Sequence, residues 1–340
     1  MPIEYEVRGR DLLWMRNPFT RVISYVVDLR DKSFSFTLGA RAFTAPPPTH
    51  TDAERMARAK AGCPFCPGNE SKAPAELIRI KPEQVPGWDG DPASPWALRV
   101  FNNLFPRIPA ELTGGRNESY VVVEDSRHFL PDARGPGDLL FTGALSEAHF
   151  VRLMEVNAQV VERSLSNPTV QSVVVRKNQG PESGASQPHI HQQIIGSPVC
   201  LPAADVELRA ERSDPTLWDD LLRVMKELDL TIENGPDVVS YASPVGAFPR
   251  SYDVVMPGHR KLLHHLEGEG LRTFARAIHR ILRFIGPLPL DYEIHQAHGL
   301  PLHAHINVRR FPYSNVAGTL NLPQGIFDSV AILRRMQGGG

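Results

Sequence analysis

The sequence has few cysteines, no excess of charge of either sign and no long apolar run. Three cysteines among 340 residues cannot form a disulfide framework, which favours a reducing compartment. The 37 basic and 38 acidic residues leave a formal net charge of −1, so no overall field attracts nucleic acid or an anionic membrane. No stretch approaches the ~18 apolar residues of a membrane span, and the start of the sequence does not resemble a secretory signal. We therefore expect a soluble, cytoplasmic protein without nucleic-acid or membrane partners.

The most informative segment is GASQPHIHQQ, at residues 184–193. In an extended segment His189 and His191 point to the same side. The small residues let backbone N–H groups approach an anion, and Ser186 adds a hydroxyl donor. A neutral imidazole is a nucleophile toward phosphorus, and with a pKa of ~6.5 roughly three quarters of it is neutral at pH 7. Covalent phosphoryl or nucleotidyl chemistry is one interpretation; a metal-ligand pair or two surface histidines is the other.

A CxxC motif, Cys63-Pro64-Phe65-Cys66, precedes this segment in the chain. It is typical of a knuckle in which two thiolates bind one zinc ion. A redox pair would need the motif to open a helix, whereas the nearby prolines predict a loop. Because no second CxxC is present, the two remaining zinc ligands are expected to be histidines, and His128 and His189 are the candidates.

These motifs together resemble galactose-1-phosphate uridylyltransferase and its relatives in the histidine-triad (HIT) superfamily. The resemblance runs from about Asn17 to His305 and is most specific from Asn178 to Gln193, with the pattern N-x-G-x(3)-GAS-x-P-H-x-H-x-Q. It implies a structural Zn²⁺ ion and a nucleophile that carries a nucleoside monophosphate. The zinc ligands that it implies are Cys63, Cys66, His128 and His189, and the nucleophile is His191.

The resemblance also implies a set of residues around the substrate. Gln193 would hydrogen bond a phosphoryl oxygen, while Ser186 and Asn178 would position the phosphate and the imidazole. Phe101, Asn102 and Asn103 would line the base and ribose pocket, Arg16 would contact phosphate, and Gln324 would take part in holding the sugar.

The two halves of the chain repeat one order of predicted elements, which is a strand, an amphipathic helix, a second strand and an HxH motif. The apolar residues of the helices have helical spacing at 150–161 and 271–285, with Ser146 as the N-cap of the first. We predict an α+β fold of duplicated HIT-like halves, 1–197 and 198–340, each a mostly antiparallel sheet backed by helices. The joining segment is expected to hold one further helix, with Asp214 as its N-cap and Pro215 at its first position.

The second HxH motif, His303 and His305, lacks the small-residue turn and the trailing glutamine, so it is not expected to be a second nucleophile. In relatives this motif joins an upstream histidine and a glutamate in a second metal site. Here His298 (or His295) could supply the third nitrogen and Glu207 the carboxylate, a set of ligands that suits zinc or iron. The alternative is a pair of histidines packed within the sheet, without a metal.

The resemblance implies a nucleotidylyltransferase. His191 would attack the α-phosphorus of a nucleotide sugar, and a sugar 1-phosphate would then take the nucleoside monophosphate from the histidine. With phosphate or water as acceptor, the protein would instead be a nucleotide-sugar or dinucleoside-polyphosphate phosphorylase or hydrolase; a third alternative is a zinc-stabilised nucleotide-binding protein without turnover. Thr319 falls near the place of a sugar-holding tyrosine of relatives, and Lys177 stands where they often have an acid. The base and the acceptor stay open, and a homodimer is expected by resemblance.

Overall fold

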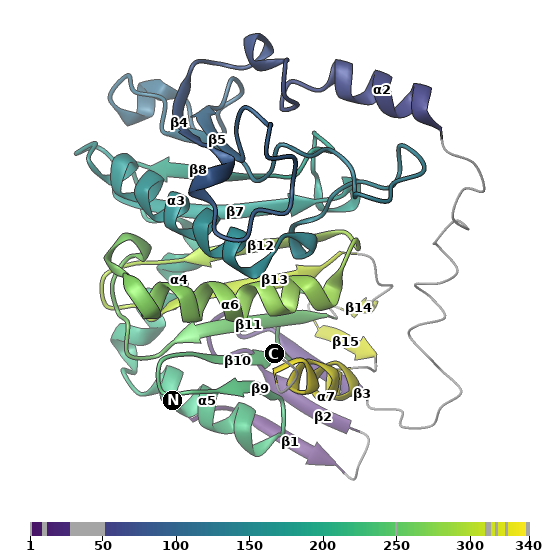
Figure 1. Cartoon of the computed structure of the whole chain (residues 1–340). Helices are drawn as coiled ribbons and strands as arrows, with labels where there is room; N and C mark the ends of the chain where they lie inside the picture. The colour runs from purple at the N-terminus through teal and green to yellow at the C-terminus, as the bar shows by residue number, and fades with distance from the viewer. Residues whose placement is uncertain are drawn as a thin grey trace. The chain divides into compact units, whose positions relative to one another are not determined.

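The computed structural model describes residues 2–8, 12–27, 52–248, 250–309, 314–316, 319–323 and 326–337. The chain forms two compact units, which we call unit 1 and unit 2. Unit 1 takes its described residues from Met1–Ala45, Pro202–Leu262 and Leu290–Gly340, and unit 2 from Pro46–Leu201 and Leu263–Pro289. Figure 1 shows the elements of both along the chain.

The five strands of the sheet in unit 2 are antiparallel and follow the order β4-β5-β6-β8-β7. Their bounds are β4 (Glu76–Ile80), β5 (Leu98–Asn102), β6 (Ser119–Val123), β7 (Ser172–Gln179) and β8 (His191–Ser197). Side chains alternate between the two faces of each strand. On β7 the alternation separates buried Val173, Val175 and Lys177 from half-buried Val174, Arg176 and Asn178. The polar face of β7 is thus less covered than its other face.

The helices of unit 2 are α2 (Ala53–Gly62), α3 (Glu147–Leu165) and α6 (Gly268–Ile285). Helix α3 packs on β7 and β8, and α6 packs on α3. The predicted N-cap of α3 is confirmed, because the Ser146 hydroxyl accepts a hydrogen bond from the His149 N–H. Short 3-10 turns occur at Glu70–Lys72, Pro82–Gln84, Ala110–Thr113, Thr142–Ala144, Pro181–Ser183 and Leu263–His265.

The larger sheet of unit 1 is also antiparallel and follows the order β9-β10-β11-β13-β12. A smaller sheet has the order β1-β2-β3-β15-β14, in which β15 and β3 are parallel. The bounds are β9 (Thr231–Asn234), β10 (Val239–Ala242), β11 (Ser251–Met256), β12 (Leu290–His295), β13 (Leu302–Val308), β1 (Tyr5–Arg8), β2 (Leu12–Arg16), β3 (Ile23–Val27), β14 (Ser314–Val316) and β15 (Thr319–Pro323). The helices are α4 (Pro202–Ser213), α5 (Leu217–Glu227) and α7 (Ile326–Gln337).

The sheet of unit 2 and the larger sheet of unit 1 have the same topology. The fourth and fifth strands along the chain exchange places in the spatial order of each, and an HxH histidine lies on the inner of these two strands, β8 or β13. Helix α3 precedes β7 as α6 precedes β12. The predicted α+β class, with antiparallel sheets and helices, is confirmed.

Two features differ from the sequence-based expectations. The compact units do not divide the chain between residues 197 and 198, because α6 packs on α3 and belongs with unit 2. The joining segment holds two helices, α4 and α5, and Asp214 lies between them. Thr216 is the N-cap residue of α5, and the Asp214 carboxylate accepts hydrogen bonds from its N–H and its hydroxyl. Within the described part of the chain, no helix is both long and apolar enough to cross a membrane.

Candidate active site and metal-binding clusters

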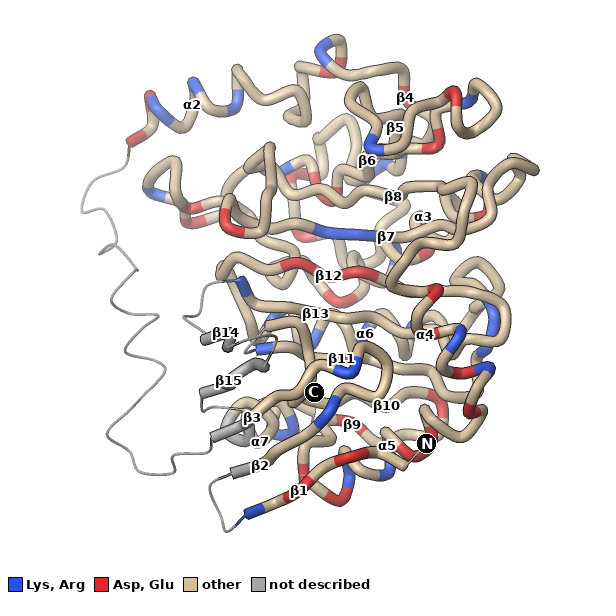
Figure 2. Tube along the Cα trace, turned by 180° about the vertical axis from the view of Figure 1, so that it is seen from behind, with Lys and Arg blue, Asp and Glu red and all other residues tan. Residues whose placement is uncertain are grey.

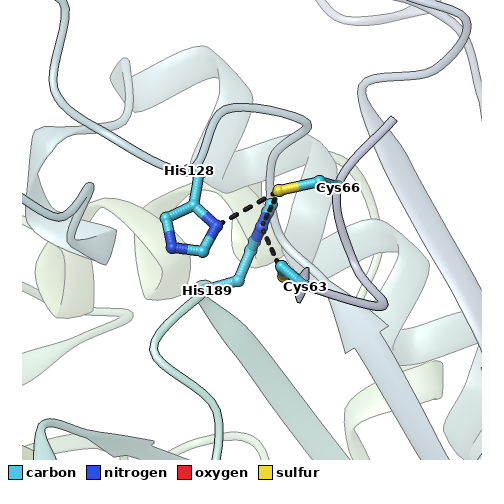
Figure 3. Close-up of side chains that lie close together, drawn as sticks. All are labelled: Cys63, Cys66, His128 and His189. Carbon is cyan, nitrogen blue, oxygen red and sulfur yellow. Dashed lines mark hydrogen bonds between the residues drawn. The ribbon is translucent and has the colours of Figure 1, made fainter. Parts of the chain in front are cut away.

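The CxxC motif and two distant histidines of unit 2 form a buried cluster (Figure 3). The ligand atoms of Cys63, Cys66, His128 and His189 all lie within 4.8 Å of one another. The Cys66 Sγ is 3.1 Å from Nδ1 of His128 and 3.5 Å from Nδ1 of His189, and the Cys63 Sγ is 3.6 Å from Nδ1 of His189. In a tetrahedral site, zinc bonds of ~2.3 Å to sulfur and ~2.0 Å to nitrogen put the two atoms roughly 3.5 Å apart. The cluster could therefore hold one metal ion.

The surroundings of the cluster orient its ligands. The CxxC motif follows the end of α2 in a loop, as predicted, and does not open a helix. Nε2 of His189 lies 2.7 Å from the carbonyl oxygen of Asp125, which leaves Nδ1 of His189 for the thiols. This second hydrogen bond fixes the tautomer and the direction of a metal-binding imidazole.

Each of the two thiols of this cluster shifts the pKa of the other. The hydrogen bond with Cys66 lowers the pKa of Cys63 to about 2 against the effect of burial, and His128 and His189 contribute to the lowering. The hydrogen bond with Cys63, burial and the charge of Cys63 raise the pKa of Cys66. The pair thus favours one thiolate, on Cys63, and a bound divalent cation would stabilise the thiolate form of both.

The metal ligands border a cavity of about 570 Å³ within unit 2. Cys66 and His128 contribute to its lining, together with Met56 and Lys60 of α2. Nε2 of His128 is buried and has no hydrogen-bond partner among the described residues. The cavity therefore adjoins the cluster on the side of Cys66 and His128.

His191 begins β8 and is 7% exposed. Its Nδ1 lies 2.8 Å from the carbonyl oxygen of His189, so Nδ1–H donates and Nε2 is left as the nitrogen with a lone pair. Burial, and secondly the charge of Lys177, lower the pKa of His191 to about 4. The imidazole is therefore neutral at pH 7, as a nucleophile must be. Its ring packs against Phe65 of the CxxC motif, with ring centroids 5.2 Å apart.

The turn before the HxH motif is held by hydrogen bonds of its own. Gly180 and Gly184 adopt positive φ angles of 79° and 85°, which favour glycine. The Asn178 amide donates to the Ser183 carbonyl, and the Ser183 hydroxyl lies 2.9 Å from the carbonyl of Gln179 and 2.8 Å from that of Gly180. Ser186 is exposed at the end of this turn. Asn178 thus shapes the turn in which its predicted partner Ser186 lies.

Other predicted substrate residues lie on or beside the same sheet. Gln193 is half-buried on the face of β8 that carries His191, opposite Val121 of β6. Phe101 is 2% exposed and packs in the core with the two cysteines. The Asn102 amide donates to the Asn117 carbonyl at 2.8 Å, and the Asn103 side chain accepts from the Phe105 N–H at 3.0 Å.

Two predicted residues are not in the described part of unit 2. Arg16 is on β2 of unit 1, where Nε of its guanidinium is 3.0 Å from the Glu4 carboxylate. Gln324 is outside the described residues. Their roles toward a substrate remain predictions.

A second buried cluster lies in unit 1 and joins Glu207 of α4 to His295 of β12 and to His303 and His305 of β13. The antiparallel register places His303 directly opposite His295. The Glu207 carboxylate is 2.8 Å from Nδ1 of His295, 3.2 Å from Nε2 of His303 and 3.1 Å from Nε2 of His305. Burial by itself raises the pKa of Glu207, but the histidines hold it well below its usual value. Three imidazoles around one carboxylate could hold a second metal ion.

The position of the third histidine corrects the sequence-based choice of His298. His298 lies in the turn after β12 and is not part of the cluster. His295 takes its place because it is the last residue of β12 and faces His303 across the strand pair. Sequence reasoning also missed Asp253 of β11, whose carboxylate is 2.6 Å from Nδ1 of His305.

Sequence reasoning further missed a buried ion pair behind the nucleophile. Nζ of Lys177 lies 2.6 Å from Oε1 of Glu124. Figure 2 shows the basic stretch of β7 that contains Arg176 and Lys177. The sequence held two signals, a lysine at a buried position of the strand's alternation and its place where relatives often have an acid.

Several known proteins are similar to this chain in sequence or in structure. No protein-family model matches the chain. A curated relative, ADP-glucose phosphorylase of Arabidopsis thaliana, is 26% identical over 260 residues, which cover 69% of this chain and 67% of that protein. The crystal structure of an ADP-glucose phosphorylase from Arabidopsis thaliana with bound ADP-glucose matches with a TM-score of 0.66 and 20% identity, covering 94% of this chain and 98% of that one. A uridylyltransferase structure matches with a TM-score of 0.56 and 18% identity, covering 79% and 95%.

These comparisons and the duplicated sheets define the class of fold. The chain shares the fold of an ADP-glucose phosphorylase and of a uridylyltransferase, and the resemblance expected from its motifs is confirmed at the level of the fold. The relatives include phosphorylases as well as uridylyltransferases, so the class does not name the acceptor.

Proposed function

We propose that the protein transfers a nucleoside monophosphate from a nucleotide sugar to a phosphate-bearing acceptor through a covalent intermediate on His191. The observation that carries the proposal is the neutral, buried imidazole whose Nδ1–H is fixed by the His189 carbonyl. In-line attack by Nε2 of His191 on the α-phosphorus forms the N–P bond and releases the sugar phosphate. The acceptor then attacks the same phosphorus and restores the free imidazole. Backbone N–H groups of the turn, Ser186 and Gln193 stabilise the charge on the phosphoryl oxygens.

The cluster of Cys63, Cys66, His128 and His189 fits zinc in this proposal. Two sulfurs and two nitrogens at tetrahedral spacing suit a structural Zn²⁺ ion with all four positions filled. Such an ion holds the HxH segment to the CxxC loop and leaves no open position for activating water. A homodimer, expected by resemblance, and a cytoplasmic location, expected from the composition, are also part of the proposal.

The acceptor has two candidates. A hexose 1-phosphate is the acceptor that the sequence motifs favour. Inorganic phosphate is favoured by the relative named ADP-glucose phosphorylase and by Thr319, which stands near the expected place of a sugar-holding tyrosine. The acceptor is therefore the compound that removes the nucleoside monophosphate from His191.

Intact-protein mass after mixing with nucleotide sugars tests the proposal. We expect ADP-glucose or UDP-glucose to add one AMP or UMP, when the reaction is quenched at alkaline pH to preserve the N–P bond. Adding inorganic phosphate or a hexose 1-phosphate should then remove the adduct, and the faster of the two is the acceptor. Dinucleoside polyphosphates in the same panel test the hydrolase alternative. Zinc-loaded protein that acquires no adduct from any donor would contradict covalent transfer and favour a binding protein.

We also propose that the second cluster holds a zinc or iron ion. Nδ1 of His303 lies 2.7 Å from the Pro301 carbonyl and Nδ1 of His305 lies 2.6 Å from Asp253, so both direct Nε2 toward Glu207. Replacing Glu207 by alanine is expected to reduce bound metal from two ions per chain to one. Elemental analysis by mass spectrometry measures this content. The control is Glu233→Ala, because Glu233 is half-buried on β9 and lies outside both clusters. Equal metal content in the Glu207 variant and the wild type would contradict the second site.

A further inference from the structure

A lysine and a glutamate lie buried together behind the strand that carries the nucleophile. Lys177 is on β7 and Glu124 follows β6 directly, and their side chains are 1% and 0% exposed. The ammonium and the carboxylate are 2.6 Å apart. Burial lowers the pKa of Lys177, and the charge of Glu124 opposes this effect. The pair is therefore a buried ion pair in the interior of unit 2.

The contribution of a buried ion pair to folding stability does not explain its presence here. Removing two charges from water is costly, and replacing a buried ion pair by apolar residues of similar volume is often neutral or stabilising. Glu124 is nevertheless held firmly, because the Thr142 hydroxyl donates to its Oε2 at 2.6 Å. The contacts of Glu124 with Thr142 and Lys177 therefore indicate that it helps to arrange the residues around His191.

The pair holds the main chain at the nucleophile. Nζ of Lys177 also donates to the carbonyl oxygen of His191, at 3.2 Å. The N–H of Glu124 donates to the carbonyl of Ile190, also at 3.2 Å. The carbonyl of His191 is thus bound by the ammonium of the ion pair, and that of Ile190 by the main chain of Glu124.

The lysine reaches this strand from the face opposite the imidazole. In the antiparallel register Lys177 is opposite Gln192, and side chains of neighbouring residues on a strand point to opposite faces. The ammonium therefore touches the backbone of His191 and not its ring. The ring direction depends on the main chain from 189 to 191, because Nδ1–H is bound to the His189 carbonyl.

We propose that Lys177, held by Glu124, is a positioning residue that fixes the main chain at His191 and so directs Nε2 of His191 at the phosphorus of the substrate. The inference rests on the proposed function, whose reaction it deepens. A displacement of about 1 Å between reacting groups can slow a reaction about 100-fold.

The first test compares two variants of the zinc-loaded protein. Lys177→Met removes the ammonium, and the double variant Lys177→Met with Glu124→Leu removes both charges. We expect both to form the nucleotidyl-histidine about 10- to 100-fold more slowly in single-turnover experiments, with donor Kd and zinc content unchanged. The double variant should melt at a higher temperature than the single one. Lys226→Met, an exposed lysine of α5 in unit 1, is the matched control.

A partial rescue separates the hydrogen bond from the charge. Lys177→Gln keeps a donor for the His191 carbonyl and should be faster than Lys177→Met. A double variant that regains both the melting temperature and the wild-type rate would show that Lys177 only compensates the charge of Glu124, which would overturn the proposal. The same conclusion follows if Lys177→Met reacts at the wild-type rate. If Lys177→Met does not fold, the double variant carries the test.

The second test needs no turnover. Nitrogen-15 NMR of the histidine rings should show His191 as the Nδ1-protonated tautomer in the wild type and as a mixture of tautomers in the double variant. If the wild type forms no adduct and the tautomer still changes, the transfer function fails and the positioning role stands. If the adduct forms and the tautomer and rate are unaffected, the positioning role fails and the transfer function stands.

Discussion

Replacing His191 by alanine is expected to lower the rate of nucleotidyl transfer by at least about 10⁴-fold, because removal of a nucleophile eliminates the covalent route. The imidazole is at the start of β8 and its ring contacts Phe65 at a centroid distance of 5.2 Å. Loss of this ring leaves a small cavity, so we expect the fold to persist. Steady-state transfer and intact-protein mass measure the effect, and the AMP or UMP adduct should be absent.

The control for this variant is His265→Ala. His265 is exposed and lies outside both metal-binding clusters. Its replacement should leave the adduct and the rate unchanged. An adduct that persists in His191→Ala at the wild-type rate would place the nucleophile on another residue.

Replacing Cys63 by serine is expected to lower the affinity of the first cluster for zinc by more than ~100-fold. Loss of a residue that only hydrogen bonds a metal ligand commonly lowers metal affinity by about 10- to 100-fold, and loss of a ligand itself should cost more. The Cys63 Sγ lies 3.6 Å from Nδ1 of His189, within the expected ligand spacing. Zinc content per chain should fall by one, and the melting temperature should fall with it, because metal-binding free energy contributes to folding. Metal analysis and thermal unfolding measure the two effects.

Cys200→Ser is the matched control, since it makes the same chemical change at the third cysteine. Cys200 is half-buried and outside the cluster. Its replacement should leave zinc content unchanged. Full zinc content in Cys63→Ser would contradict the ligand assignment, and the rate of zinc release to a chelator provides a second measure.

Local motifs predicted much of the candidate site. The spacing of CPFC and of the HxH segment limited which residues could share a metal or face a phosphate, and His128 and His189 were the candidates for the two remaining zinc ligands. The structure brings these four candidate ligands together. Such motifs are readable because neighbouring residues in the chain have nearly fixed separations.

Long-range pairing decided what the motifs left open. His295 rather than His298 joins Glu207, because the antiparallel register of β12 and β13 places His295 opposite His303. Asp253 reaches His305 only through the pairing of β11 with β13. Neither contact could be read from sequence spacing, since strand register is set by how side chains pack in the folded sheet.

The sequence by itself determined the class of chemistry and the α+β order of elements. Hydrophobic periodicity located α3 and α6, and the glycine-rich turn with its two histidines indicated a phosphate-directed nucleophile. The tertiary structure decided that α6 belongs with unit 2 and that Lys177 and Glu124 meet behind His191. Periodicity records which side of a helix or strand is buried, whereas the choice of partner depends on packing among segments distant in the chain.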